Sequence, residues 1–501
     1  MLKMLKMLYR RRCHVAKETK QSSSHFRVTT TTTPSTSTPI PCYNYQSVLT
    51  SPFYYFKRLS LFVLLFVVVV WYYYDIKYYY SNSNNNSRFG WTVSRKNPTT
   101  TTSTASRISK KEQDVVIPQL PEQLFIGYVD KLEEEEKIIQ AVKDGVNVLI
   151  WAFFNFNETT GEIEYSSSQM SHVESLIQNK LSSTTETELI HLTSFGGWNG
   201  PHLPTSSSSP PQHYYYSSKE LYDSWVRFNY QHNQLFHGFD WDLEGHDNPT
   251  SKTSNLTLDC IQYMIQITKY AKNDGYIVGM APPQSYLDIQ SDHTTTNNNN
   301  NGGGGPFSTQ LNLPPLLSSL WHPEFHYTGY NSYAPLLLFS DIDFISIQFY
   351  ETWSRANYEI NHRTDNKKKV DPSTYLIQYV EDLVYNRNQG YHVLFSSKHL
   401  AHFTNNNKEE EEELVRKFIP VPINKLVFGF ANGWALNRKD GGVLYVDPMD
   451  VQKAFETFKK KKSAILPRGC MFWSIGWEGE NGIHFAKELH QKLWNNNNNK
   501  T

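Results

Sequence analysis

The stretch FHGFDWDLEG, residues 236–245, carries three carboxyl groups at alternate positions, Asp240, Asp242 and Glu244, separated by large apolar residues. In a β-strand successive side chains face opposite sides, so the acids would share one face and the apolar residues the other. The Cα atoms of Asp242 and Glu244 would then lie about 6.6 Å apart, which lets both side chains contact one ligand ring. The spacing therefore indicates acid chemistry concentrated on one face of a strand.

Crowded carboxyl groups in a buried site cannot all ionise, because burial and like charges raise the pKa of at least one of them. A carboxylic acid that keeps its proton near neutral pH is what a glycosidic leaving group requires. Two other interpretations fit the same residues, an inward-facing ion cluster and three oxygen ligands for a divalent metal ion. The stretch by itself leaves these interpretations open. We expect acid catalysis without a metal ion or a cofactor.

Eight short apolar runs predict the strands that would position these acids. They are rich in β-branched and aromatic residues and are bounded by Gly and Asp, which is typical of buried parallel strands. The runs span residues 124–129, 147–154, 189–198, 236–245, 276–283, 344–351, 425–433 and 469–477.

Between the runs, apolar residues recur at helical spacing, as in residues 138–142 and 258–268. Strands that alternate with helices predict an α/β fold, a closed (β/α)8 TIM barrel, with an open doubly wound sheet as the alternative. In such a barrel the acids face the axis. Glu244, the last of them, lies at the C-terminal mouth, where barrel enzymes keep their catalytic groups.

The segments outside the barrel differ in composition. Residues 1–58 are rich in Lys and Arg, residues 59–74 are uncharged and apolar, and residues 75–118 are rich in Ser, Thr and Asn. They predict a basic cytoplasmic tail, a transmembrane signal anchor and a stalk, with the barrel at 119–494 and a polar tail at 495–501. The apolar segment is just shorter than the usual ~17–25 residues of a spanning helix.

The charge asymmetry around the anchor orients the barrel toward the lumen or the exterior. We therefore expect a single-pass type II membrane protein of the secretory pathway, secreted if the anchor is cleaved. A cleaved signal peptide and a mitochondrial presequence remain as alternatives. The glycosylation triplets at Asn85, Asn157, Asn255 and Asn499 are compatible with lumenal exposure.

The remaining features of the sequence exclude several classes. A formal net charge of zero argues against a general nucleic-acid binder, and no GxGxxG or GxxxxGK[ST] pattern supports a nucleotide-dependent mechanism. The four cysteines show no metal-ligand spacing; Cys260 and Cys470 are either a disulfide or two buried thiols. Low-complexity inserts near residues 206–218, 294–305 and 404–413 are expected to be solvated loops. We expect a monomer.

Five of the runs together resemble glycoside hydrolase family 18, the chitinases and their relatives. GFDWDLE is similar to the family's DGxDxDxE signature, SFGGW to its third strand, MAPP to its fifth, QFYE to its sixth and MFWSIGW to its eighth. The resemblance covers roughly residues 120–494. It implies a TIM barrel and substrate-assisted retention at an N-acetylhexosamine, for which the enzyme needs no nucleophile.

The resemblance implies a role for each acid. Glu244 would protonate the departing oxygen and later serve as base for the incoming water. Asp242 would bond the acetamido N–H and stabilise the oxazolinium, and Asp240 would share a proton with Asp242. Tyr350 and Gln348 match the sixth-strand residues that hold the acetamido group.

The resemblance also implies contacts with the substrate. Trp473 looks like the tryptophan that floors the sugar subsite, and Met280 is expected in the acetamido pocket or in plain packing. Ser194 is expected to donate to Asp240, while Gly196 and Gly197 permit close approach of the backbone to the acids.

Three residues depart from the family pattern. His237 stands where the family's first aspartate is usual, Glu351 replaces the frequent asparagine after the sixth-strand tyrosine, and Gly476 replaces an acid of the eighth strand. By alternation His237 lies on the outer side, so we expect a structural role for it. The other two departures put the subsite contacts, the pH optimum and the substrate in question.

The sequence therefore predicts an endo-acting hydrolase of β-1,4-linked N-acetylglucosamine polymers. The alternatives are an endo-β-N-acetylglucosaminidase that acts on N-glycans and a non-hydrolytic chitinase-like lectin. The expected partners are an N-acetylglucosamine-containing glycan and a membrane, through residues 59–74.

Overall fold

The computed structural model describes residues 117–493 except for 185–187, 206–215, 247–250, 252, 254–255, 290–330, 353, 363–368, 405–412, 438–441 and 462–465. All of them belong to the second of two compact units, Lys110–Thr501. The predicted tails 1–58 and 495–501 and the predicted anchor 59–74 lie outside the described residues, as does the predicted stalk except for its last two positions. In the part of the chain that the structure describes, no helix is long and apolar enough to cross a membrane.

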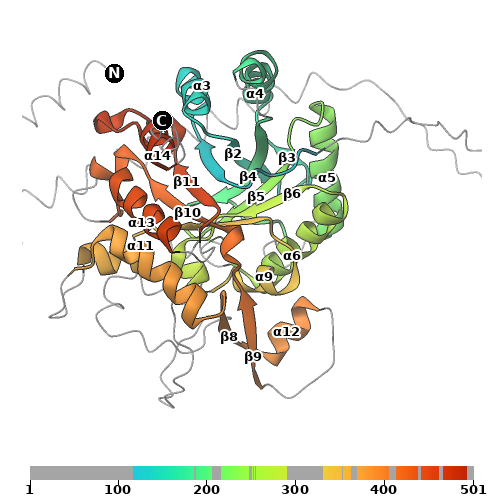
Figure 1. Ribbon diagram of the computed structural model, residues 1–501. Coiled ribbons are helices and arrows are strands. Elements are labelled where there is room, and N and C mark those ends of the chain that lie inside the picture. The colour runs from blue at the N-terminus through green and yellow to red at the C-terminus, as the bar shows by residue number, and fades with distance from the viewer. Residues whose placement is uncertain are drawn as a thin grey trace, which may run out of the picture. The chain divides into compact units, whose positions relative to one another are not determined.

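Eight parallel strands close into a barrel (Figure 1), and each lies within or beside a predicted run. The strands are β1 (Leu124–Val129), β2 (Val148–Phe156), β4 (Ile190–Gly197), β5 (Gly238–Leu243), β6 (Ile277–Met280), β7 (Phe344–Gln348), β10 (Leu426–Ala431) and β11 (Gly469–Trp473). Each strand pairs in parallel with the next, and β1 pairs with both β2 and β11. This pairing closes the sheet, so the TIM barrel is confirmed and the open-sheet alternative is wrong.

Helices surround the barrel and connect its strands (Figure 1). They are α3 (Glu135–Lys143), α4 (Ser167–Asn179), α5 (Ser218–Gln231), α6 (Leu258–Asn273), α9 (Ala334–Phe339), α11 (Pro372–Glu381), α13 (Pro448–Lys460) and α14 (Phe485–Leu493). The periodic segments near 138–142 and 258–268 lie in α3 and α6, as predicted. The start of α5 is fixed by a capping box between Ser217 and Glu220.

The side chains of β5 alternate between two environments. Phe239, Trp241 and Leu243 belong to the apolar layer between the barrel and its helices. Asp240 and Asp242 occupy the intervening positions and are buried on the axis side. The outer layer takes the apolar bulk of this strand, so the fold can tolerate acids on its inner face.

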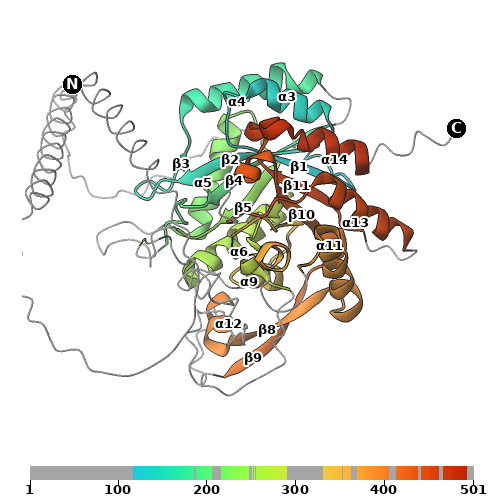
Figure 2. The same ribbon diagram turned by 90° about the vertical axis from the view of Figure 1, so that its left-hand side faces the viewer.

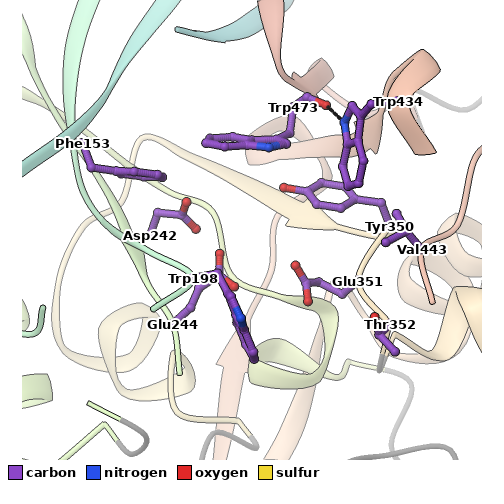
Figure 3. A pocket seen from close by; sticks show the side chains of 10 residues that line it. All are labelled: Phe153, Trp198, Asp242, Glu244, Tyr350, Glu351, Thr352, Trp434, Val443 and Trp473. Atoms are coloured by element: carbon purple, nitrogen blue, oxygen red, sulfur yellow. Dashed lines mark hydrogen bonds between the residues drawn. The ribbon is translucent and has the colours of Figure 1, made fainter. Parts of the chain in front are cut away.

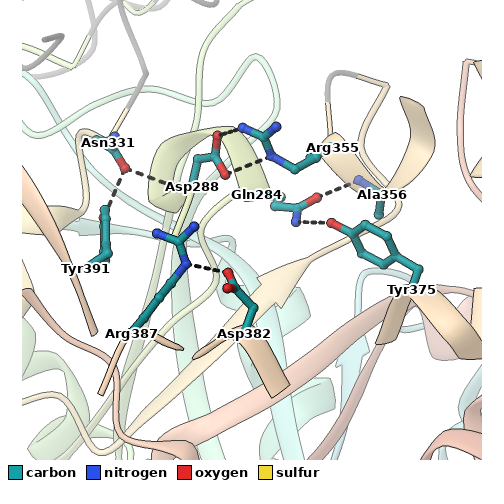
Figure 4. Close-up of polar contacts among 9 residues, drawn as sticks. All are labelled: Gln284, Asp288, Asn331, Arg355, Ala356, Tyr375, Asp382, Arg387 and Tyr391. Carbon is teal, nitrogen blue, oxygen red and sulfur yellow. Dashed lines mark hydrogen bonds and ion pairs between the residues drawn. The ribbon is translucent and has the colours of Figure 1, made fainter. Parts of the chain in front are cut away.

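A buried polar network joins the segments that follow β6 and β7 (Figure 4). The guanidinium of Arg355 pairs with Asp288 through Nε and a terminal nitrogen. The side-chain oxygen of Gln284 accepts a hydrogen bond from the Ala356 amide at 2.9 Å. Its side-chain nitrogen donates to the Tyr375 hydroxyl at 2.8 Å. The network also contains Asn331, whose side-chain oxygen accepts from the Asp288 amide and from the hydroxyl of Tyr391. Residues that follow β6 and β7 are thereby held together.

Two parts of the fold were not predicted. A short strand β3 (Ile163–Glu164) forms a hairpin with β2, and an antiparallel pair, β8 (Gly390–Ser396) and β9 (Leu414–Pro420), is joined through α12 (Ser397–Phe403). The β8–β9 pair and α12 lie together at one side of the barrel in both views (Figures 1 and 2). The polar insert that separates β8 from β9 along the chain hid the pairing between them.

Candidate active site

The three acids of the opening stretch lie where the sequence predicts them. Asp240 and Asp242 are on β5, Glu244 follows its end, and all three side chains are buried. In the neighbouring strand β4, Ser194 and Gly196 lie opposite Asp240 and Asp242 in the register. Parallel pairing with β4 therefore brings the predicted third-strand motif against the acids.

Asp240 is the most enclosed acid and has two hydroxyl partners. The Tyr128 hydroxyl and the Ser194 hydroxyl donate to its Oδ2 at 2.6 and 3.2 Å. Burial raises the pKa of Asp240 to about 7, although both donors act in the opposite direction. The predicted contact with Ser194 is confirmed, while Tyr128 was not predicted.

Gln348 joins the two other acids. Its side-chain nitrogen lies 2.7 Å from Asp242 Oδ1, 3.2 Å from Glu244 Oε1 and 2.7 Å from the carbonyl oxygen of Ala281. An amide nitrogen carries two hydrogens, so it cannot bond all three oxygens fully at once. Gln348 therefore bridges the acids without neutralising either of them.

The carboxyl groups of Asp242 and Glu244 are electrostatically coupled. Burial, the charges of Glu244 and Asp240 and a hydrogen bond with Glu244 raise the pKa of Asp242 well above its ordinary value. Burial raises the pKa of Glu244 to about 7, while hydrogen bonds with Gln348 and Asp242 lower it. Two adjacent buried carboxyl groups cannot both ionise easily, so the pair retains a proton near neutral pH.

Glycines at the end of β4 allow the strands to approach closely. Gly196 has φ +109°, and a Cβ there would meet the Asp242 carbonyl oxygen at 2.5 Å. Gly197 has φ +81°, and its Cβ would lie 2.4 Å from the Phe153 ring. A side chain at either position would displace the backbone or the ring, which confirms the predicted reason for glycine here.

Asp242 and Glu244 open into a cavity of about 380 Å³, a size within the range of small-molecule sites. The lining residues, shown in Figure 3, are Phe153, Trp198, Asp242, Glu244, Tyr350, Glu351, Thr352, Trp434, Val443 and Trp473. Trp473 stacks with Phe153 at a centroid distance of 5.5 Å. The indole N–H of Trp434 donates to the Trp473 carbonyl oxygen at 2.8 Å. The walls are therefore largely aromatic, and the charged side chains among the described lining residues are acids.

Tyr350 and Trp473 line this cavity together with the acids, in agreement with the sequence analysis. Met280 does not. It is fully buried in the outer apolar layer, opposite Trp241 in the register. Strand alternation explains the difference, because Gly279 takes the inward position beside Asp240. The predicted pocket role of Met280 is wrong and its packing role is confirmed.

The three departures from the family pattern have different surroundings. His237 accepts a hydrogen bond from the His191 amide at 3.0 Å, consistent with the expected structural role, and burial lowers its pKa to about 4. The carbonyl oxygen of Gly476 accepts a hydrogen bond from the Lys137 ammonium group. Glu351 lines the cavity; burial and the charge of Glu244 raise its pKa well above the ordinary value. Only Glu351 adds a charged side chain to the cavity.

Several residues of the site were missed in the sequence. Phe153, Trp198 and Trp434 each lie at or just beyond the C-terminal end of a predicted strand. That position was the available signal, because the ends of all barrel strands meet at one mouth. Their aromatic type alone did not distinguish them from residues of the core.

The other expectations concern metal ions and cysteines. Across residues 117–493, gaps excepted, no group of three or more His, Cys, Asp and Glu side chains is arranged to hold a metal ion. Cys260 and Cys470 are both buried and free, so the disulfide alternative is wrong.

Comparisons with known proteins give a likeness only among solved structures. No protein-family model and no curated protein sequence matches the chain. A fungal endo-β-N-acetylglucosaminidase of glycosyl hydrolase family 18 is 13% identical, covers 75% of this chain and 100% of its own, and has a TM-score of 0.41. A family 18 chitinase of Flavobacterium johnsoniae is 13% identical, with coverage of 74% and 94% and a TM-score of 0.38.

A chitinase-like agglutinin of Robinia pseudoacacia is 14% identical, with coverage of 74% and 99% and a TM-score of 0.37. Likenesses at these TM-scores carry no argument about chemistry. The function is therefore inferred from the side chains of the cavity.

Proposed function

We propose that this protein is a glycoside hydrolase that cleaves β-1,4-linked N-acetylglucosamine polymers, chitin or chitooligosaccharides, at internal bonds. The observation that carries the proposal is the pair Asp242 and Glu244, two buried carboxyl groups that retain a proton and open into an aromatic cavity. A carboxylic acid with a pKa near 7 can protonate a glycosidic oxygen near neutral pH. Aromatic faces in the same cavity offer surfaces on which sugar rings can stack.

The proposed reaction follows substrate-assisted retention. Glu244 donates its proton to the departing glycosidic oxygen while the acetamido oxygen of the substrate attacks the anomeric carbon. Asp242 bonds the acetamido N–H and stabilises the positive charge of the oxazolinium that forms. Glu244, now ionised, takes a proton from the water that opens the ring, and the configuration at the anomeric carbon is retained.

Other residues of the cavity support this reaction. Tyr350 and Gln348 would hold the acetamido group against Asp242, and Trp473 would form the floor beneath the sugar. Asp240, bonded by Tyr128 and Ser194, lies deeper than Asp242. Its charge state adjusts the pKa of Asp242, because its charge is among the causes that raise this pKa.

One experiment tests the proposal. The full-length protein in detergent is incubated with an N-acetylglucosamine tetramer and, separately, with a high-mannose glycopeptide, beside the variant Glu244→Gln. Cleavage of the tetramer by the wild type, with a loss of about 10²–10⁴-fold in kcat for the variant, is expected because the general acid is removed. Mass spectrometry of the products identifies the bond that is cut.

The other outcomes separate the alternatives. Cleavage of the glycopeptide alone would replace the proposal with an endo-β-N-acetylglucosaminidase. Binding of the tetramer without cleavage, equal in wild type and variant, would make the protein a lectin. Activity that disappears with a chelator and returns with a divalent ion would support the metal-site interpretation.

We also propose that residues 59–74 anchor the protein in a membrane of the secretory pathway, with the barrel in the lumen or outside the cell. The support is the uncharged apolar segment that follows a basic one. Protease treatment of intact membrane vesicles is expected to spare the barrel. Digestion of the barrel without detergent would reverse the proposed orientation.

A further inference from the structure

The cavity contains one acid for which the proposed reaction has no use. Glu351 follows Tyr350 directly in the chain, and both side chains line the cavity. Figure 3 shows the carboxyl group of Glu351 reaching toward the space between Trp198 and Trp473. Glu351 therefore faces the volume that a bound sugar would occupy.

Glu351 has acids, and no cations, as its neighbours in the cavity. Among the described lining residues there are three carboxyl groups, of Asp242, Glu244 and Glu351, and no Lys, Arg or His. The charge of Glu244 acts on Glu351, and Glu351 in turn raises the pKa of Asp242. In the described part of the chain no hydrogen bond or ion pair holds the Glu351 carboxyl group.

Two other polar atoms nearby also lack partners. Glu244 Oε2 and Gln348 Oε1 are buried and have no hydrogen-bond partner among the described residues. The Glu244 side chain, 5% exposed, lines the cavity, so its free oxygen indicates a ligand with hydrogen-bond donors at this place. These atoms and the Glu351 carboxyl group share one region of the site, where an ammonium group would favour the ionised carboxylates and supply the missing hydrogen-bond donors.

The proposed reaction restricts which sugar unit can supply the cation. The unit that is cleaved must keep its acetyl group, because the acetamido oxygen is the nucleophile. Glu244 has to reach the glycosidic oxygen, which joins this unit to the leaving unit. Glu351 and Glu244 line the same cavity, so the leaving unit, which is joined to the bond that Glu244 has to reach, lies within the volume that Glu351 faces.

We propose that Glu351 selects substrates whose leaving unit carries a free amino group, so that the preferred polymer is partly deacetylated chitin. This inference rests on the proposed function and specifies its substrate. The ammonium group of a glucosamine unit can donate up to three hydrogen bonds and brings the positive charge that the cavity lacks. An acetylated unit offers one N–H and no charge.

The test uses the full-length protein in detergent and two tetramers. One is fully acetylated, and the other carries a single glucosamine as the third unit from the non-reducing end. kcat/KM is measured on both for the wild type, Glu351→Gln and Glu136→Gln. Glu136 is exposed on α3 and serves as the matched control for loss of one negative charge.

The measured quantity is the ratio of the two kcat/KM values, glucosamine tetramer over acetylated tetramer. We expect Glu351→Gln to lower this ratio roughly tenfold, which corresponds to about 1.4 kcal/mol, and Glu136→Gln to leave it unchanged. Product masses must place the amine on the leaving side of the cut bond. A ratio that is equal in wild type and Glu351→Gln would overturn the inference.

Failure of the proposed function gives a different result. If the folded wild type cleaves neither tetramer, that function is wrong, and calorimetric titration with both tetramers still tests Glu351. Tighter binding of the glucosamine tetramer that is lost in Glu351→Gln would support the amine preference. Equal affinities of the wild type for the two tetramers would contradict the amine preference. Circular dichroism melting of each variant verifies that the protein is folded.

Discussion

Two groups of buried carboxyl side chains lie near the barrel mouth and have opposite partners. Asp288 is 1% exposed, and Asp242 and Glu244 are 3% and 5% exposed, so all three are removed from water to a similar degree. Asp288 faces the guanidinium of Arg355 (Figure 4). Asp242 and Glu244 line one cavity (Figure 3), and the neutral amide of Gln348 contacts both of them.

Because burial is the same, the partner decides what each acid can do. A buried carboxylate with a fixed cation stays ionised and holds two loops together, and it is costly to disturb. A buried carboxyl group without a cation holds a proton that it can give away. The absence of a cation beside Asp242 and Glu244 therefore suits the proton transfer proposed for this pair.

Removal of the Arg355 guanidinium should have the largest effect on the free energy of unfolding. Arg355→Ala removes the guanidinium that pairs with the buried Asp288, and we expect it to lower the free energy of unfolding by about 3–5 kcal/mol. Arg387→Ala removes a more exposed partner of Asp382 and should cost at most about 1 kcal/mol. Urea denaturation followed by tryptophan fluorescence measures both. Equal losses of unfolding free energy in the two variants would contradict the special role of the buried pair.

Removal of the Asp242 carboxyl group, which has no cation beside it, should not lower the stability and should abolish most of the activity. Asp242→Asn is expected to lower kcat by about 10²–10³-fold, because an electrostatic stabiliser of the transition state is lost. The unfolding midpoint should stay equal or rise, since repulsion with Glu244 and Asp240 is relieved. Kinetics on the acetylated tetramer and thermal melting provide the two readouts. A lowered midpoint with intact kcat would contradict this assignment.

Tyr128→Phe tests how a neutral hydrogen-bond donor affects Asp240, the most buried of the three acids. It removes the 2.6 Å hydrogen bond to Asp240, a donor that lowers the pKa of this acid. A hydrogen bond to a charged group is worth about 1.5–3 kcal/mol, so kcat should fall by about tenfold or more. The pKa of Asp240 should rise, visible as a shift in the pH–rate profile. Tyr222→Phe, which removes a hydroxyl bonded to the more distant Asp274, is the control and should leave the profile unchanged.

The pH dependence of stability should show the smallest effect. Folding raises the pKa of Asp240 from 3.8 and of Glu244 from 4.5, both to about 7. A raised pKa means that the protonated forms stabilise the fold, so this contribution is present below the ordinary pKa values and is lost as pH rises through about 7.

Melting temperature is therefore expected to decline between about pH 4.5 and pH 7, where the two acids lose their protons. The decline should be shallower in Glu244→Gln, because one of the titrating groups is absent. Calorimetric scans at several pH values measure it. Identical slopes for the variant and the wild type would show that Glu244 does not hold its proton in the fold.

Much of the fold was predictable because each barrel strand has its own short apolar pattern in the sequence. All eight runs contain or overlap a strand, and the alternation in β5 separates Asp240 and Asp242 from Trp241 as predicted. The pair β8 and β9 was missed, since the pairing of Tyr391 with Ile419 joins residues on opposite sides of a polar insert. Long-range pairing of this kind leaves no local pattern.

The candidate site was predictable where a motif fixed the direction of a side chain. Ser194 and Gln348 were identified by the resemblance of their strands to the family's motifs, and both contact the acids. Tyr128 and Trp434 come from strands without an acidic motif, and their proximity to the site depends on closure of the barrel. The resemblance left Met280 between a pocket role and a packing role, and only the register of β6 with β5, in which Met280 pairs with Trp241, shows that it faces outward.

The amide nitrogen of Gln348 has a consequence for recognition. It has two hydrogens for three nearby oxygens, so Gln348 leaves one of these oxygens without a full hydrogen bond. A sugar that brings an N–H group completes the set, whereas an otherwise identical sugar without that group leaves an acceptor bare in a place of low polarity. If the proposed function holds, we therefore expect plain glucose polymers, which lack an N–H group, to bind less tightly than acetamido sugars.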